Sequence, residues 1–362
     1  MFRLQRVPLQ VKLLLIELQQ FFNDYQWLHF QSIVLALLVT PYKATLSGMV
    51  RVLSFGSHRS KHNKFLNDGC MILGKALKFY AMLILQLLKK PGEPLYFIID
   101  DTSNKKRGKH ILAAFKFFDH TSKQYIWGHQ LVCTVIEYRG MVIPFAIEVY
   151  IPKNSSKQDN IYKKKKTEIA SDILSEFDPD EKQEVYVVAD TYYAAPAIMN
   201  LCRKRGYNFV SMLKTNRILI RNNRQINVSG YTRRYLNRKK RARVIKLSDK
   251  KKYEVHSEKV VLKSGGAVKI VCTRSRSHCT VKTIFTTNTA LPIESILNAY
   301  SRRWSIEVFF KMSKQYLGLK AYQSINLPAT ESAVRLSLIS YNLLTHMFIE
   351  EQRAQGKRIT DK

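Results

Sequence analysis

The chain has 362 residues, of which 46% are hydrophobic and 11% aromatic, so it can build a hydrophobic core and is not a disordered protein. Lys and Arg number 60 against 27 Asp and Glu, and the formal net charge of +33 exceeds what solubility requires. We therefore expect a polyanionic partner, with nucleic acid first, and no small-molecule substrate.

The sequence predicts neither a membrane protein nor a fold held together by structural zinc. Its longest apolar runs, IVLALLV near Ile33 and YAMLILQLL near Tyr80, are much shorter than the roughly 20 residues that a membrane span needs. The apolar N-terminus is interrupted by Lys12 and Glu17 and lacks a cleavage site for a signal peptide. The five cysteines show no spacing typical of structural zinc. We expect a cytoplasmic protein.

Residues 1–92 are predicted to form an N-terminal helical domain. Their apolar periodicity is helical, with breaks at TPYKAT and SFGSHRSKHN. The segment TLSGMVRVLSFGSHRSKHNKFLND fits a helix-turn-helix in which Arg59, Lys61 and Lys64 face phosphate. It fits a plain helical module with a solvated basic face equally well. We expect this domain to bind DNA.

From residue 93 the pattern alternates between strands and helices. Strands are predicted for LYFIID, QYIWGHQLVCTVIEY and GMVIPFAIEVYI, then a helix for TEIASDILSEF, a strand for EVYVVAD, a helix ending at Gly206 and a strand for YNFVSML. This order predicts an α/β fold, with a mixed sheet covered by helices as in ribonuclease H. We assign residues 93–214 to the first part of this core.

The remaining residues are predicted to add an insertion and to complete the core. Residues 215–287 contain strand-like pieces joined by a basic run and predict a β-rich insertion. Residues 288–362 contain a long helical pattern from Ile293 through Leu319 and a final amphipathic helix, SAVRLSLISYNLLTHMFIEEQ.

One acidic residue stands among basic ones in YSRRWSIEVFFKMSK. On a continuous helix, Tyr300, Arg303, Glu307 and Lys314 fall within an arc of about 60°. Four polar side chains would then face a single ligand. An exposed Arg303–Glu307 salt bridge at i, i+4 is the alternative explanation for the same spacing.

The spacing of these four residues resembles the Y-x2-R-x3-E-x6-K signature of insertion-sequence-four-type transposases, bacterial members of the DDE transposase and integrase superfamily. Trp304 resembles an aromatic residue that follows the arginine in relatives. The resemblance extends from about Leu95 to Lys320, because two further acidic motifs lie upstream in the expected order.

The two upstream motifs place aspartates at strand ends. In FIIDDTSN, periodicity cannot choose between Asp100 and Asp101, and the resemblance implies Asp101 because family members place the ligand directly before threonine. In VYVVADTYYAAP, Asp190 follows an apolar strand, and an N-cap is its alternative role. Here Tyr192 and Ala194 depart from the small and aromatic residues that are commonest in the family.

The resemblance implies a metal-dependent DNA transposase. Asp101, Asp190 and Glu307 would be the catalytic residues and would hold two Mg²⁺ ions, for which Mn²⁺ can substitute, because hard cations prefer carboxylate oxygens. Tyr300, Arg303 and Lys314 would contact terminal phosphates, and Trp304 would stack on an unpaired base unless it is a half-buried core residue. Lys105 and Lys106 in NKKRGKH would add phosphate contacts.

The expected partner is double-stranded DNA, namely the terminal inverted repeats of a transposon and its target DNA, within the bacterial cytoplasm. Relatives act as dimers that bridge two ends, so the resemblance implies a homodimer in a synaptic complex. A nuclease of the same fold without strand transfer, and an inactivated DNA-binding derivative, are the two alternatives. The presence of all three acids counts against inactivation.

Overall fold

The computed structural model of the chain describes residues 4–41, 43–53, 58–119, 122–153, 163–236, 243–246, 252–275 and 281–357. The fold is mixed α/β, and the chain divides into two compact units. Unit 1 comprises Met1–Pro91, Asp101–Ile169 and Ser305–Lys362, and unit 2 comprises Gly92–Asp100 and Ala170–Trp304. The division between the units falls inside strand β1 (Leu95–Lys105), between Asp100 and Asp101.

The N-terminal part of unit 1 is helical, as predicted. A capping box starts α2, because the Asn23 side chain accepts the N–H of Gln26 at 2.9 Å and the Gln26 side chain accepts the N–H of Asn23 at 3.2 Å. The helices are α1 (Leu9–Leu15), η1 (Ile16–Phe21), α2 (Asp24–Val39), α3 (Leu46–Val50), α4 (Arg59–Asp68) and α5 (Cys70–Leu88).

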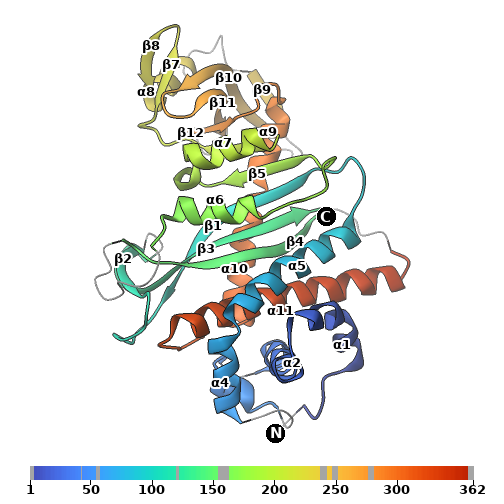
Figure 1. The fold of residues 1–362 in the computed structure, drawn as a ribbon. Helices are drawn as coiled ribbons and strands as arrows, with labels where there is room; N and C mark the ends of the chain where they lie inside the picture. Colours follow the sequence, from blue (N-terminus) through green and yellow to red (C-terminus); the bar gives the residue numbers. More distant parts are fainter. Residues whose placement is uncertain are drawn as a thin grey trace. The chain divides into compact units, whose positions relative to one another are not determined.

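Among the described residues, α5 is the one helix long and apolar enough to cross a membrane by length and composition. It packs instead as a core helix. Leu73, Leu77 and Ile84 are spaced on one face and are at most 1% exposed. The helix contacts β4 (Met141–Tyr150) and α11 (Leu327–Ala354), as Figure 1 shows. The predicted final amphipathic helix is α11, and it packs against β4 as well as against α5.

The strands of unit 1 form an antiparallel meander. Strand β2 (Phe115–Asp119) pairs with β3 (Gln124–Tyr138), and β3 pairs with β4. Arg139 and Gly140 connect β3 to β4, and their φ angles of 51° and 77° are those of a two-residue hairpin turn with left-handed residues. The predicted strands β3 and β4 are therefore present, whereas the short strand β2 was not predicted.

Unit 2 contains a mixed sheet with flanking helices. The first half of β1 (Leu95–Lys105), β5 (Val185–Ala189) and β6 (Asn208–Met212) are parallel, and β12 (Val281–Thr286) runs antiparallel to β6. The sheet continues through β11 (Gly266–Ser275), β10 (Lys252–Leu262), β7 (Ile218–Arg221) and β8 (Arg224–Asn227), and β9 (Arg243–Lys246) pairs with β10. The helical elements are α6 (Lys166–Ser175), whose first residues belong to unit 1, η2 (Thr191–Tyr193), α7 (Pro196–Lys204), α8 (Val228–Leu236) and α9 (Ile293–Ser301).

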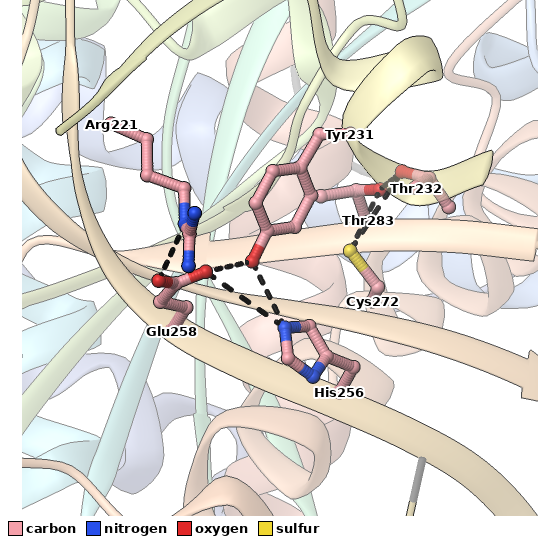
Figure 2. A network of polar contacts seen from close by, with 7 residues as sticks. All are labelled: Arg221, Tyr231, Thr232, His256, Glu258, Cys272 and Thr283. Atoms are coloured by element: carbon pink, nitrogen blue, oxygen red, sulfur yellow. Dashed lines mark hydrogen bonds and ion pairs between the residues drawn. The ribbon is translucent and has the colours of Figure 1, made fainter. Parts of the chain in front are cut away.

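A polar network holds α8 against the strands of the β-rich segment (Figure 2). The hydroxyl of Tyr231, a fully buried residue, donates to Glu258 Oε2 at 2.5 Å, and Arg221 Nε donates to Glu258 Oε1 at 2.7 Å. Burial opposes ionisation of Glu258, but these hydrogen bonds outweigh it and lower the pKa of this carboxyl. The Thr232 and Thr283 hydroxyls lie 3.2 Å apart and add a buried contact.

The region predicted as one helix from Ile293 to Leu319 contains two helices. Helix α9 ends at Ser301 and α10 (Trp304–Tyr316) begins three residues later. Between them the chain makes a turn, in which the N–H of Arg303 bonds to the carbonyl of Tyr300 at 3.2 Å. The prediction of a continuous helix is therefore wrong, and the single polar arc drawn on that helix does not apply.

Candidate active site

Two aspartates stand in unit 2 where the parallel pairing of two adjacent strands ends. Strands β1 and β5 pair in parallel, with Ile99 opposite Ala189. The next residue on each strand is an aspartate, Asp100 on β1 and Asp190 after β5. Residues in equivalent register positions direct their side chains to the same face of a sheet. The two carboxylates are therefore neighbours at the sheet edge where α/β proteins commonly place their sites.

Arg303 and Tyr300 join these aspartates. Arg303 Nη1 donates to Asp100 Oδ2 at 3.1 Å, and the two side chains are only 21% and 16% exposed. Burial raises the pKa of Tyr300, the guanidinium of Arg303 opposes this effect, and the charges of Asp190 and Asp100 add to it. These four side chains, which we call the aspartate cluster, are thus in electrostatic contact within one unit.

Asp101 lies in a different setting. Successive strand residues point to opposite faces, so its side chain leaves the face that carries Asp100. Its carboxylate pairs with Lys166 of α6, whose Nζ lies 2.6 Å from Oδ2 and whose side chain is 10% exposed. This geometry favours Asp100 over the predicted Asp101 as the neighbour of Asp190. The sequence signal for Asp100 was the Asp-Asp pair, but it could not rank the two residues.

The other predicted site residues have diverse environments. Glu307 is half-buried on the first turn of α10, and Lys105 is exposed. Lys314 donates to the carbonyl of Ser103 at 2.9 Å, and burial lowers its pKa. Trp304 is 63% exposed, which rules out the alternative of a half-buried core residue and leaves its ring accessible.

Lys106 is buried rather than exposed. Only 3% of the residue is accessible, and its Nζ donates to the carbonyl of Tyr322 at 2.5 Å and lies 3.2 Å from the centre of that ring. Burial lowers the pKa of Lys106 to about 7. This environment argues against the predicted phosphate contact, because the amino group ties β1 to the segment after α10. The basic run that joins the strand-like pieces of residues 215–287 lies mostly outside the described residues.

The aspartate cluster has the donor chemistry for a hard divalent cation, because carboxylate oxygens are the ligands that Mg²⁺ prefers. Asp100 and Asp190 supply two such groups at neighbouring positions. Across the described ranges, no group of three or more His, Cys, Asp or Glu side chains is gathered to hold a metal. The pair therefore fits two positions of a metal shell, and Arg303 supplies positive charge beside it.

The comparison with protein families matches the part of the chain that contains both aspartates. The family model for DDE superfamily endonucleases matches residues 17–280. A probable transposase for insertion sequence element IS701 from Microchaete diplosiphon is 27% identical over 178 residues, which cover 47% of this chain and 42% of that protein. The family match thus includes β1 and β5 and stops before the segment from Tyr300 to Lys314.

Proposed function

Because the chain belongs to the DDE superfamily of endonucleases, we propose that it is an insertion-sequence transposase that cuts DNA at transposon ends and joins those ends to target DNA. The observation that carries the proposal is the register that sets Asp100 beside Asp190, because a pair of neighbouring carboxylates suits metal-dependent phosphodiester chemistry. The basic composition suits a DNA substrate.

We further propose a ribonuclease H-like core for this chain. The parallel strands β1, β5 and β6 and their flanking helices support this assignment. In this proposal residues 93–214 and 288–362 form the core, residues 215–287 form a β-rich insertion, and residues 1–92 bind DNA. Arg59, Lys61 and Lys64 are exposed on α4, as a phosphate-binding face requires.

In the proposed site, Asp100 and Asp190 would hold a divalent cation, for which Mg²⁺ is the first candidate and Mn²⁺ a substitute, and we keep Glu307 as a further proposed catalytic acid. A bound cation would stabilise charge on the scissile phosphate and lower the pKa of a nucleophilic water. Arg303 orients the carboxylate of Asp100 by its hydrogen bond and balances its charge.

Tyr300 and Trp304 have separate roles in this proposal. The Tyr300 hydroxyl, whose pKa burial raises, stays protonated at neutral pH and is suited to donate a hydrogen bond to a phosphate oxygen. Trp304 presents an accessible ring on which an unpaired base can stack. We propose Lys314 as a positioning residue, because its amino group fastens α10 to β1 through Ser103.

The partners of the proposed transposase are its own inverted terminal repeats and a target duplex in the bacterial cytoplasm, with a homodimer bridging two ends. The experiment that tests this function incubates the purified chain with Mg²⁺, a linear fragment carrying the flanking inverted repeats and a circular target plasmid. Fragment joined to plasmid is the expected product. Cleaved ends without joined product would instead identify a nuclease, and intact DNA would refute both activities.

A further inference from the structure

A cavity of about 200 Å³ opens directly after Asp190 in unit 2. One wall is the turn that follows this aspartate, and the other is the segment that follows β6. Because the first wall begins at Thr191, the residue next to Asp190, any group bound in the cavity lies beside the proposed cleavage site. The lining of the cavity includes Tyr192, Ala194, Pro196, Leu213, Lys214 and Arg217.

The cavity combines one aromatic face with two cations. The ring of Tyr192 packs edge-on against the ring of Tyr193, a fully buried residue, with the ring centres 5.4 Å apart, and Tyr192 itself is 47% exposed. Lys214 Nζ lies 5.9 Å from the centre of the Tyr192 ring. Arg217 reaches the same wall, where its Nη2 donates to the carbonyl of Ala194 at 3.1 Å. Apolar walls at Leu213 and Pro196 complete the lining.

This lining matches a planar ring that carries an anionic group. Aromatic side chains stack on nucleobases without regard to sequence. Lysine and arginine bind phosphate, the first as a point charge and the second through a planar fork of donors. No acidic side chain is among the residues that line the cavity, so nothing in its wall repels a phosphate.

We propose that this cavity binds one unpaired nucleotide of the DNA strand held at Asp190, with its base on Tyr192 and its phosphate between Lys214 and Arg217. The inference rests on the proposed function in taking DNA as the substrate. A free nucleotide offers the same ring and phosphate. The neighbouring Asp190 favours the nucleotide of a DNA strand, and the experiment separates the two sources.

The chain offers a matched control in Tyr125 of β3. This tyrosine is 67% exposed, and Lys116 Nζ lies 5.4 Å from the centre of its ring. The pair therefore repeats the tyrosine and lysine of the cavity, but its residues do not line the cavity. Loss of Tyr125 should leave nucleotide binding unchanged if the cavity, rather than any exposed tyrosine near a lysine, makes the site.

The test uses a single-stranded oligonucleotide with 5-iodouracil, irradiated with the full-length protein and analysed by peptide mass spectrometry. We expect the cross-link on the peptide that contains Tyr192, with at least a tenfold lower yield in Tyr192→Leu and an unchanged yield in Tyr125→Leu. Lys214→Gln, at an exposed position that does not endanger folding, should lower the yield about threefold or more. The absence of a cross-link on the Tyr192 peptide, or equal yields on that peptide in all variants, would overturn the inference.

Competition with thymidine monophosphate separates the sources. The oligonucleotide should remain cross-linked until the mononucleotide is in large excess, whereas displacement at equal concentration would overturn binding as part of a strand. The result is also separable from the proposed function. Joined products without a Tyr192 cross-link would refute the cavity alone, and a Tyr192 cross-link without cleavage or joining would refute the transposase alone.

Discussion

Asp100 and Asp190 occupy neighbouring positions just past the parallel pairing of β1 with β5, because the last pair in that register is Ile99 with Ala189. Asp101 follows on the opposite face and is paired with Lys166. The two consecutive aspartates thus have different environments, one in the aspartate cluster and the other in an ion pair. This difference makes their roles separable by substitution.

Asp100→Asn should abolish Mg²⁺-dependent nicking of inverted-repeat DNA, while Asp101→Asn should retain most of it. Changes around a metal ligand typically cost about 10–100-fold, so loss of a ligand should exceed about 100-fold. Asp101→Asn should instead destabilise the fold by about 1–3 kcal/mol, because it leaves the buried Lys166 without its carboxylate partner. Nicking assays measure the loss of activity, and urea unfolding measures the loss of stability. If Asp101→Asn abolished nicking and Asp100→Asn did not, Asp101 would be the metal ligand instead of Asp100.

Arg303→Ala should weaken nicking more than DNA binding. Arg303 donates to Asp100, so its loss frees a carboxylate that the fold otherwise orients, and a loss of about 10–100-fold is expected. Arg303→Lys should recover little of this, because an ammonium lacks the planar fork of the guanidinium. The control is Arg302→Ala, which removes the same charge from the same turn. If Arg302→Ala and Arg303→Ala lowered nicking equally, Arg303 would act only as one more positive charge on the surface and not through Asp100.

Lys106 should make stability depend on pH in the alkaline range. Burial lowers its pKa from 10.5 to about 7, so between these values the unfolded chain binds a proton that the folded chain does not. The free energy of unfolding therefore gains up to about 1.4 kcal/mol per pH unit as the pH rises above 7, and gains nothing from this group below 7. Urea unfolding of Lys106→Met should lack this rise, and Lys105→Met, at the exposed neighbour, should keep it.

Tyr231→Phe should destabilise the β-rich segment by about 1–2 kcal/mol at neutral pH, because it removes a buried hydrogen bond to a carboxylate. The pKa of Glu258 is lowered in the folded chain, so its contribution is present above pH 4.5 and is lost as the pH falls through the folded value. The difference in the free energy of unfolding between the wild type and Tyr231→Phe should therefore become smaller in acid. If this difference stayed constant from pH 7 to pH 3, the destabilisation by Tyr231→Phe would come from packing alone and not from the hydrogen bond to Glu258.

Much of the fold could be predicted from the sequence, because buried strands leave strong apolar runs. LYFIID and QYIWGHQLVCTVIEY lie in observed strands, and EVYVVAD contains the whole of β5. Gly206, with a φ of 71°, follows the end of α7 at Lys204, two residues beyond that helix. Strand β2 was missed because its five residues carry a lysine and an aspartate and show no such run. The break at Arg302 and Arg303 was missed because neither residue is a helix breaker.

The candidate site was less accessible to prediction, because it depends on pairing between distant segments. Both faces of the strand before Asp100 and Asp101 are apolar, so only the register with β5 distinguishes the two residues. Lys106 sits in a basic run that is typical of solvent-exposed sequence, and its burial follows from the contact with Tyr322, far along the chain. Lys214 and Arg217 are proposed to bind phosphate only because the structure places them in the lining of one cavity with Tyr192.

The central claim is that this chain cuts DNA through a set of carboxylates. The most direct measurement is Mg²⁺-dependent nicking of inverted-repeat DNA by the wild type, Asp190→Asn and Glu307→Gln, with binding of the same DNA followed in parallel. We predict nicking by the wild type, a loss of more than about 100-fold in both variants, and binding within about threefold of the wild type. Variants that nick as fast as the wild type would contradict the account.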